Sequence, residues 1–149
     1  ESITDTIPDS TALICGDLER TWLDYDDRAA RIANLLTSHG LGDDSKVGIY
    51  LHNSNEYLEV QYGVFKIKGV PINVNYRYKE DELVYLLDNA DAEAVFISCT
   101  ALRAVEVLDQ IEEQISKYVI SSNQAMIWDC LRSVNINNRI SGYGKLFSN

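Results

Sequence analysis

The glycines and histidines of the sequence match none of the spacings that are typical of phosphate or metal binding. Gly40-Leu41-Gly42 and Gly142-Tyr143-Gly144 each lack the third glycine of a dinucleotide-binding fingerprint, and no Gly-x-x-x-x-Gly-Lys-Ser/Thr or Gly-x-Ser-x-Gly sequence occurs. His39 and His52 do not share a metal-ligand spacing with each other or with cysteines. We interpret His39 as a helix-terminal residue. His52 follows an apolar run at a place where α/β folds bind ligands, but an exposed loop histidine is the favoured interpretation.

The carboxylates and cysteines also favour structural roles. Asp26-Asp27 and Asp43-Asp44 fall in an expected helix or turn, where capping and solvation explain them without acid–base catalysis. Cys15, Cys99 and Cys130 are odd in number and widely spaced, which argues against a disulfide framework and against a zinc site. We expect Cys15 and Cys99 to be buried free thiols in a reducing, cytoplasmic setting. The residues alone therefore contain no complete catalytic set.

Composition excludes several classes of protein. A hydrophobic content of 46% fits a folded domain, and a net charge of −10 argues against binding to a nucleic-acid backbone. The apolar runs are too short to span a bilayer, so we expect no transmembrane segment. Residues 1–30 carry eight acidic against two basic side chains, whereas residues 130–149 carry three basic and no acidic ones. We interpret this asymmetry as an acidic solvated front and a mildly basic tail.

Periodicity predicts an α/β fold with a mostly parallel sheet flanked by helices and an amino-terminal hairpin. The hairpin is expected from Thr11–Cys15 and Arg20–Leu23 around the turn Gly16-Asp17. Further strands are expected at residues 47–51, 70–74, 94–98 and 117–120, with Pro71 indicating an edge strand or a strand start.

Helices are expected between these strands. They are predicted from Asp24 to His39-Gly40, from an Asn53 cap with a Glu56 partner to about Ile67, over residues 80–89 and 101–115, and more weakly over 125–131. Gly63 is expected to permit a close approach of its helix to the sheet. The remaining tail, including residues 135–138 and 142–144, is expected to be loop.

Four stretches, taken in order and spacing, resemble the amino-terminal part of the adenylate-forming (AMP-binding) enzymes, nearest the fatty-acyl-CoA synthetases. They are Thr21–Tyr25, Lys46–Tyr57, Phe65–Arg77 and Glu80–Ala92. The resemblance covers about residues 8–121. It implies an incomplete amino-terminal α/β subdomain over residues 1–121, followed by a divergent, weakly structured tail over 122–149.

The family's activity is the activation of a carboxylic acid with ATP and magnesium to an acyl-adenylate, followed by transfer of the acyl group to coenzyme A. Its Ser/Thr/Gly-rich phosphate loop and its carboxy-terminal catalytic lysine have no counterpart in this sequence. The resemblance therefore implies a fragment or truncated relative of an acyl-CoA synthetase, inactive alone. Its partner would be the missing remainder of the enzyme or a second copy. The alternative is a non-catalytic binding or interaction module derived from the same framework.

One position has an implied role in binding. In some CoA ligases of this family, an arginine in the segment that matches Asn75-Tyr76-Arg77 contacts a phosphate of coenzyme A. Arg77 matches by place, and a guanidinium suits bidentate phosphate contact. Pairing of Arg77 with Glu80 or Asp81 is the alternative. No catalytic residue and no metal ligand is assigned. His52 replaces the proline that is usual before Asn-Ser in the family.

Overall fold

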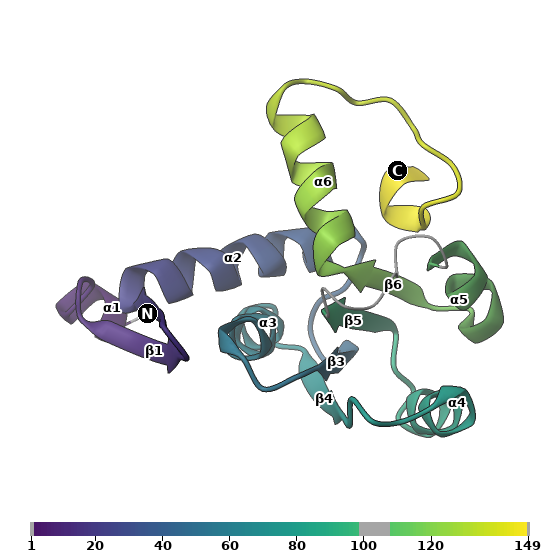
Figure 1. Cartoon of the computed structure of the whole chain (residues 1–149), viewed down its shortest axis with the longest axis horizontal. Helices are drawn as coiled ribbons and strands as arrows, with labels where there is room; N and C mark the ends of the chain where they lie inside the picture. The colour runs from purple at the N-terminus through teal and green to yellow at the C-terminus, as the bar shows by residue number, and fades with distance from the viewer. Residues whose placement is uncertain (1, 99–107, 149) are drawn as a thin grey trace. The chain divides into compact units, whose positions relative to one another are not determined.

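The computed structural model describes residues 2–98 and 108–148, except for the side chain of Glu80. The chain forms two compact units, which are described separately. The first comprises residues 1–46 and 53–71, and the second comprises residues 47–52 and 72–149. Figure 1 shows the elements of each unit. Within the described residues, every helix is too short or too polar to traverse a lipid bilayer.

The first unit begins with a short helix α1 (Ser2–Thr6) and the expected hairpin, whose antiparallel strands are β1 (Thr11–Cys15) and β2 (Leu18–Thr21). The second strand was predicted two residues too late, because the chain already turns into helix α2 (Trp22–Ser38) at Trp22. Thr21, and not Asp24, is the N-cap. Its hydroxyl accepts the Asp24 N–H, while the Asp24 carboxylate accepts the Thr21 N–H. The helix ends at His39, as predicted, and Gly40 follows with a φ of +80°.

Helix α3 (Asn55–Lys66) packs against α2 in the same unit. Its cap is Ser54, one residue after the predicted Asn53, because the Ser54 hydroxyl accepts the Tyr57 N–H at 3.3 Å. Gly63 does permit a close approach, but the element that approaches differs from the sheet that we predicted. A Cβ at Gly63 would lie 2.7 Å from Ile32 Cγ2 and 3.0 Å from the Ala29 carbonyl oxygen, so it is helix α2 and not the sheet that approaches.

The second unit is built on a four-stranded sheet of order β4-β3-β5-β6, with the strands β3 (Lys46–Leu51), β4 (Val70–Val74), β5 (Ala94–Ser98) and β6 (Tyr118–Ser121). β3 pairs with β5, and β5 with β6, in parallel. The mostly parallel sheet is therefore confirmed. Pro71 lies in the edge strand β4, as expected of a residue without an N–H.

Helix α4 (Glu80–Asn89) has its predicted bounds, and its Leu87 lies in the core of this unit with Val74, Val95 and Val119. The predicted helix over 101–115 is observed as α5 (Leu108–Ile115), and residues 101–107 lie outside the described residues. The strand predicted at 117–120 lies one residue later. Buried side chains on both faces explain why these strands read as continuous apolar runs.

The last part of the chain contains a longer helix than the sequence indicated, while residues 135–138 and 142–144 are loop, as predicted. Helix α6 extends over Ser122–Ser133 instead of residues 125–131, because Ser121 and Gln124 form a capping box that we missed. A 3₁₀ turn, η2 (Lys145–Ser148), buries Leu146 and Phe147. The compact unit continues from residue 72 to 149, without a break at residue 121. The division of the chain at residue 121 into subdomain and tail stays a prediction.

Candidate functional site

The candidate ligand-contacting residues lie where β3 and β4 end. Tyr50 orders this region from β3: its hydroxyl group lies 2.9 Å from the Tyr76 carbonyl oxygen and 3.0 Å from that of Tyr78, and donates its hydrogen to them. The Arg77 N–H donates to Asn75 Oδ1 at 3.0 Å, which fixes a turn directly after β4. The loop backbone is thus held at several points, while its side chains remain accessible.

Three exposed side chains group where β3 and β4 end, one following β3 and two in the turn after β4. The His52 ring lies 4.1 Å from the Tyr76 ring, centroid to centroid, at an interplanar angle of 40°. Arg77 Cζ lies 5.4 Å from the Tyr76 ring centroid, within the range of a cation–π contact. Tyr76 is 39% exposed. His52 is exposed, in agreement with the interpretation that we favoured.

This grouping suits part of a nucleotide. A guanidinium can donate two hydrogen bonds to a phosphate, and an exposed tyrosine ring can stack on a base. The predicted role of Arg77 stays a prediction, because the contact with Tyr76 does not identify a ligand. The alternative was an ion pair of Arg77 with Glu80 or Asp81. The side chain of Glu80 lies outside the part of the chain that the structure describes. We did not single out Tyr76 from the sequence, where it was one of several tyrosines, although its place next to Arg77 was a usable signal.

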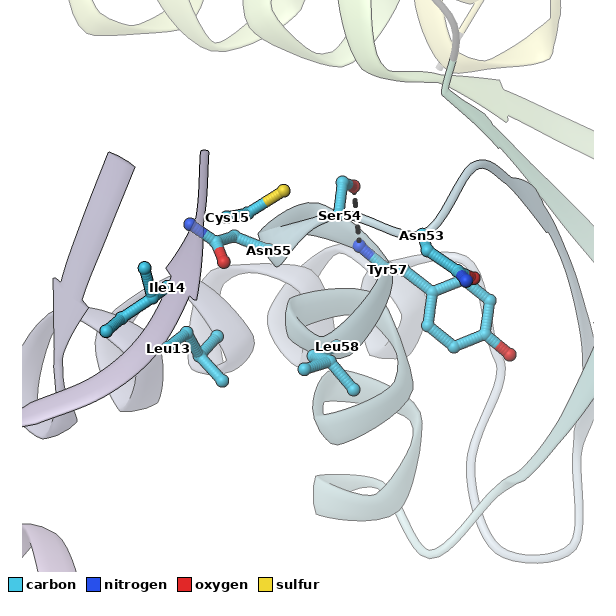
Figure 2. A pocket seen from close by; sticks show the side chains of 8 residues that line it. All are labelled: Leu13, Ile14, Cys15, Asn53, Ser54, Asn55, Tyr57 and Leu58. Carbon is cyan, nitrogen blue, oxygen red and sulfur yellow. Dashed lines mark hydrogen bonds between the residues drawn. The ribbon is translucent and has the colours of Figure 1, made fainter. Parts of the chain in front are cut away.

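A groove of about 370 Å³ lies in the first unit, between β1 and the start of α3 (Figure 2). Its apolar lining comes from Leu13, Ile14 and Leu58, and its polar lining includes Ser54 and Asn55. Cys15 also lines the groove and is exposed, so the prediction of a buried thiol at this position is wrong. The reason is that β1 belongs to a hairpin of only two strands, in which the apolar side chains of Ile14 and Leu18 are also 68% and 55% exposed. Cys99 lies outside the described residues.

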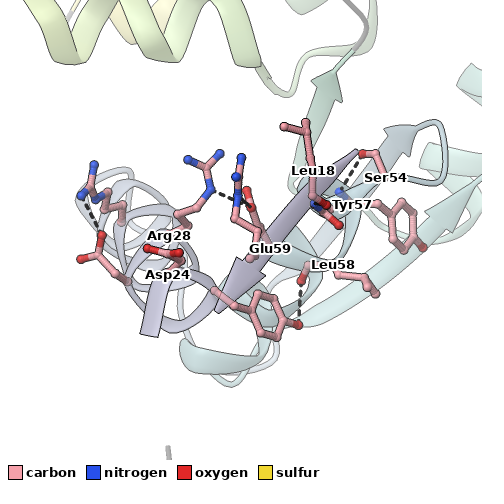
Figure 3. Close-up of polar contacts among 12 residues, drawn as sticks. Leu18, Asp24, Arg28, Ser54, Tyr57, Leu58 and Glu59 are labelled. Atoms are coloured by element: carbon pink, nitrogen blue, oxygen red, sulfur yellow. Dashed lines mark hydrogen bonds and ion pairs between the residues drawn. The ribbon is translucent and has the colours of Figure 1, made fainter. Parts of the chain in front are cut away.

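A buried carboxylate organises the polar contacts of the first unit (Figure 3). Glu59 of α3 is 2% exposed, and its Oε1 lies 2.6 Å from Arg28 Nε of α2 and 3.5 Å from Arg20 Nε of β2. The hydrogen bond that Arg28 donates to the Glu59 carboxylate raises the pKa of Arg28 above its ordinary value, against the opposing effect of burial. The arrangement ties three elements together, which is a structural role. Its signal in the sequence was a charged residue at a position of the buried helix face.

A second network joins α2 to α3. Asp26 Oδ1 accepts a hydrogen bond from the Tyr62 hydroxyl at 2.9 Å and pairs with Lys66 Nζ, also at 2.9 Å. Burial raises the pKa of Asp26, but the hydrogen bonds from Lys66 and Tyr62 outweigh that effect and hold the pKa below its ordinary value. Asp26 therefore joins α2 to α3, a contact that the predicted capping and solvation did not include, whereas Asp27 is exposed and pairs with Arg31 in its own helix. Across the side chains that the structure describes, no three His, Cys, Asp or Glu residues cluster as metal ligands would.

The fold and the sequence define the class of this protein. The family model of the AMP-binding enzymes matches residues 2–139, and the chain belongs to that family. The match extends beyond residue 121, where the resemblance that we detected ended.

Individual relatives are acyl-CoA ligases. A medium/long-chain-fatty-acid–CoA/3-oxocholest-4-en-26-oate–CoA ligase of Mycobacterium marinum is 42% identical over 95 residues, which are 64% of this chain and 17% of that protein. The medium-chain acyl-CoA ligase Mig of Mycobacterium avium is 32% identical over 125 residues, or 74% of this chain and 23% of that one. The chain therefore spans about a fifth of the length of these relatives.

Solved structures confirm the fold. The unliganded O-succinylbenzoate coenzyme A synthetase of Bacillus subtilis superposes with a TM-score of 0.72 at 18% identity, over 84% of this chain and 26% of that one. A benzoate CoA ligase of Burkholderia xenovorans gives a TM-score of 0.70 at 22% identity, over 81% of this chain and 24% of that one. The predicted framework of an adenylate-forming enzyme is confirmed.

Proposed function

We propose that this chain is an amino-terminal fragment or truncated relative of an ATP-dependent acyl-CoA synthetase, and that it is inactive alone. The observation that carries the proposal is the 42% identity to a fatty-acid–CoA ligase over 95 residues, which are only 17% of that ligase. The absence of a Ser/Thr/Gly-rich phosphate loop from the 149 residues supports it. The parent enzyme would join a carboxylic acid to ATP, releasing pyrophosphate, and then form a thioester with coenzyme A while AMP leaves. Magnesium would neutralise phosphate charge. A cytoplasmic setting is part of this proposal.

Carboxylate-dependent ATP–pyrophosphate exchange tests the proposal. The purified chain is incubated with ATP, magnesium, labelled pyrophosphate and a panel of fatty and aromatic acids, beside a full-length acyl-CoA ligase as a positive control. We expect exchange by the control and none by this chain. Exchange requires groups that bind the phosphates of ATP, and the phosphate loop is absent from the 149 residues. Acid-dependent exchange by the chain alone would overturn the proposed inactivity.

The coenzyme A contact of the parent enzyme is proposed to lie at Arg77. The exposed guanidinium beside the exposed Tyr76 ring supports this assignment, since the two together suit a phosphate and a base. Calorimetry with coenzyme A should detect weak binding that Arg77→Ala abolishes and Arg77→Lys reduces. Arg139→Ala removes an exposed arginine elsewhere in the same unit and serves as the matched control. Binding that Arg77→Ala leaves unchanged, or the absence of binding, would remove the assignment.

A second candidate function is a non-catalytic binding or interaction module with the same framework. The observation in its favour is the packing of residues 145–148, in which η2 buries Leu146 and Phe147 within the second unit. Such packing covers apolar surface within the chain itself, as expected of a module that folds on its own. Analytical ultracentrifugation and thermal unfolding distinguish the candidates. A module should stay monomeric and unfold cooperatively, whereas a fragment should expose apolar surface and aggregate.

A further inference from the structure

The open edge of the sheet at β6 has its amide donors occupied by side chains. Among the described strands, β6 has one neighbour, β5, so every second N–H of β6 faces away from the sheet. The Val119 N–H donates to Glu112 Oε1 at 3.0 Å, and the Ser121 N–H donates to Gln124 Oε1 at 3.3 Å. Two side chains from the flanking helices α5 and α6 therefore take the acceptor positions that a further strand would supply.

The same two side chains also hold the end of the chain. Glu112 Oε2 accepts the Lys145 N–H at 2.7 Å, and Gln124 Nε2 donates to the Tyr143 carbonyl oxygen at 2.6 Å. Glu112 is 3% exposed and Gln124 is fully buried. A third contact comes from Asp109 Oδ1, which accepts the Gly144 N–H at 2.6 Å. Glu112 and Gln124 therefore each make two contacts: one with a backbone N–H of β6 and one with the backbone of residues 143–145.

Apolar packing completes the contact. Leu146 and Phe147 are 2% and 4% exposed, and η2 lies against both α6 and β6. In Figure 1, η2 is the yellow turn at the carboxy-terminal end. Gly144 has a φ of +86°, and a Cβ there would lie 2.6 Å from Gln124 Nε2. A side chain at this position would be strained by the backbone conformation and would displace the Gln124 amide from its place.

We propose that residues 143–148 form an edge cap, which prevents β6 from pairing with the β6 strand of a second copy of this chain. Exposed strand edges pair readily with other strands, and proteins protect them with covering segments or charged groups. The cap supplies both forms of protection, since a buried carboxylate and a buried amide hold the covering segment in place. Without the cap, two identical edges could pair about a two-fold axis. This inference concerns association of the chain and is independent of any ligase activity.

A pair of glycine variants in the full chain tests the cap. Gly144→Ala introduces a methyl group against Gln124, whereas Gly142→Ala has a similar backbone conformation, with φ of +91°, and open space around the new methyl group. Backbone strain is therefore matched, and the variants differ in the contacts of the new methyl group, which at Gly144 lies 2.6 Å from Gln124 Nε2 and 3.3 Å from Leu108 Cβ. At low protein concentration, we expect amide exchange at residues 143–148 and at Val119 and Ser121 to be about tenfold faster in Gly144→Ala than in Gly142→Ala. Light scattering should show dimers of Gly144→Ala as concentration rises.

A second pair removes the Lys145 N–H and places the Cδ of a proline ring where that hydrogen faces Glu112. Lys145→Pro lacks the N–H that donates to Glu112, and Lys145→Ala keeps that N–H while losing the same side chain. We expect release and dimerisation of Lys145→Pro only, with protection of Val119 and Ser121 regained in the dimer. A released tail in a chain that stays monomeric overturns the proposal, as does a dimer in which those two amides stay unprotected. A tail that stays protected in both Gly144→Ala and Lys145→Pro overturns it as well.

Discussion

The carboxylate of Glu59 lies 2.6 Å from Arg28 Nε, and it is the more deeply buried member of this pair. Glu59 is 2% exposed, whereas the Arg28 side chain is 42% exposed and the Arg20 side chain 23%. The charge of the carboxylate is therefore compensated from its solvent-facing side by two guanidinium groups. Since Glu59 belongs to α3, Arg28 to α2 and Arg20 to β2, loss of this charge should loosen three elements at once.

Replacement of Glu59 tests this relationship. Glu59→Gln keeps the shape but removes the nearest counter-charge of two partly exposed guanidinium groups, so we expect it to lower the free energy of unfolding by about 1 to 3 kcal/mol. Asp27→Asn breaks the exposed pair with Arg31 and serves as the control, with an expected loss below about 1 kcal/mol. Urea unfolding followed by circular dichroism measures both. Equal losses in the two variants would show that burial of Glu59 does not matter.

Gly63 is predicted to resist substitution despite its place inside a helix. Alanine normally stabilises a helix interior by about 1 kcal/mol relative to glycine. At Gly63 the added methyl group would lie 2.7 Å from Ile32 Cγ2, so we expect Gly63→Ala to destabilise the chain by about 1 to 3 kcal/mol instead. Gly42→Ala, with no atom within 4 Å of the new Cβ, is the control and should be close to neutral. Thermal unfolding of the two variants decides the sign.

The sequence predicted the alternation of strands and helices well, because that alternation depends on local periodicity. Helix α4 was predicted with its observed bounds, since acidic residues open it and a leucine stripe continues it. Helix starts were less accurate where two residues competed as caps. Thr21 precedes Asp24, and Ser54 follows Asn53; each pair contains two good cap types, and only the backbone conformation selects one.

The contacts that local patterns could not predict join residues far apart in sequence. Gln124 binds the Tyr143 carbonyl 19 residues away, and Asp109 binds Gly144 across 35 residues. The loop-like composition around Gly142 and Gly144 did not indicate that this segment would contact helices α5 and α6. The predicted burial of Cys15 was wrong for a related reason. An apolar strand is buried only where another layer of the fold covers it.

The exposure of Cys15 has a direct chemical consequence. A thiol-reactive disulfide reagent should label Cys15 and Cys130 in the folded chain, because both are exposed. Cys15→Ser and Cys130→Ser should each lose one equivalent of rapid labelling under native conditions, with the double variant losing two. If Cys15→Ser labels at the rate and extent of the unaltered chain, then Cys15 is covered in solution and the groove beside β1 is closed.

The network around Asp26 predicts how stability depends on pH. Its hydrogen bonds with Lys66 and Tyr62 hold the pKa of Asp26 below the ordinary value of 3.8. A depressed carboxyl pKa in the folded state contributes stability that is fully present above the unfolded value and is lost as the pH falls through the folded value. Asp26→Asn should therefore be less stable than the unaltered chain at pH 7, and the difference should shrink as the pH falls below about 4.

Urea unfolding of both proteins at a series of pH values from 7 down to 2.5 measures that difference. Asp27→Asn is again the control, because it changes the neighbouring residue without removing a hydrogen bond to Lys66 or Tyr62. Tyr62→Phe removes one of the two donors and should reduce the pH dependence without abolishing it. A stability difference between Asp26→Asn and the unaltered chain that stays constant through this range would contradict the depressed pKa. It would mean that Asp26 contributes to the α2–α3 contact by shape alone.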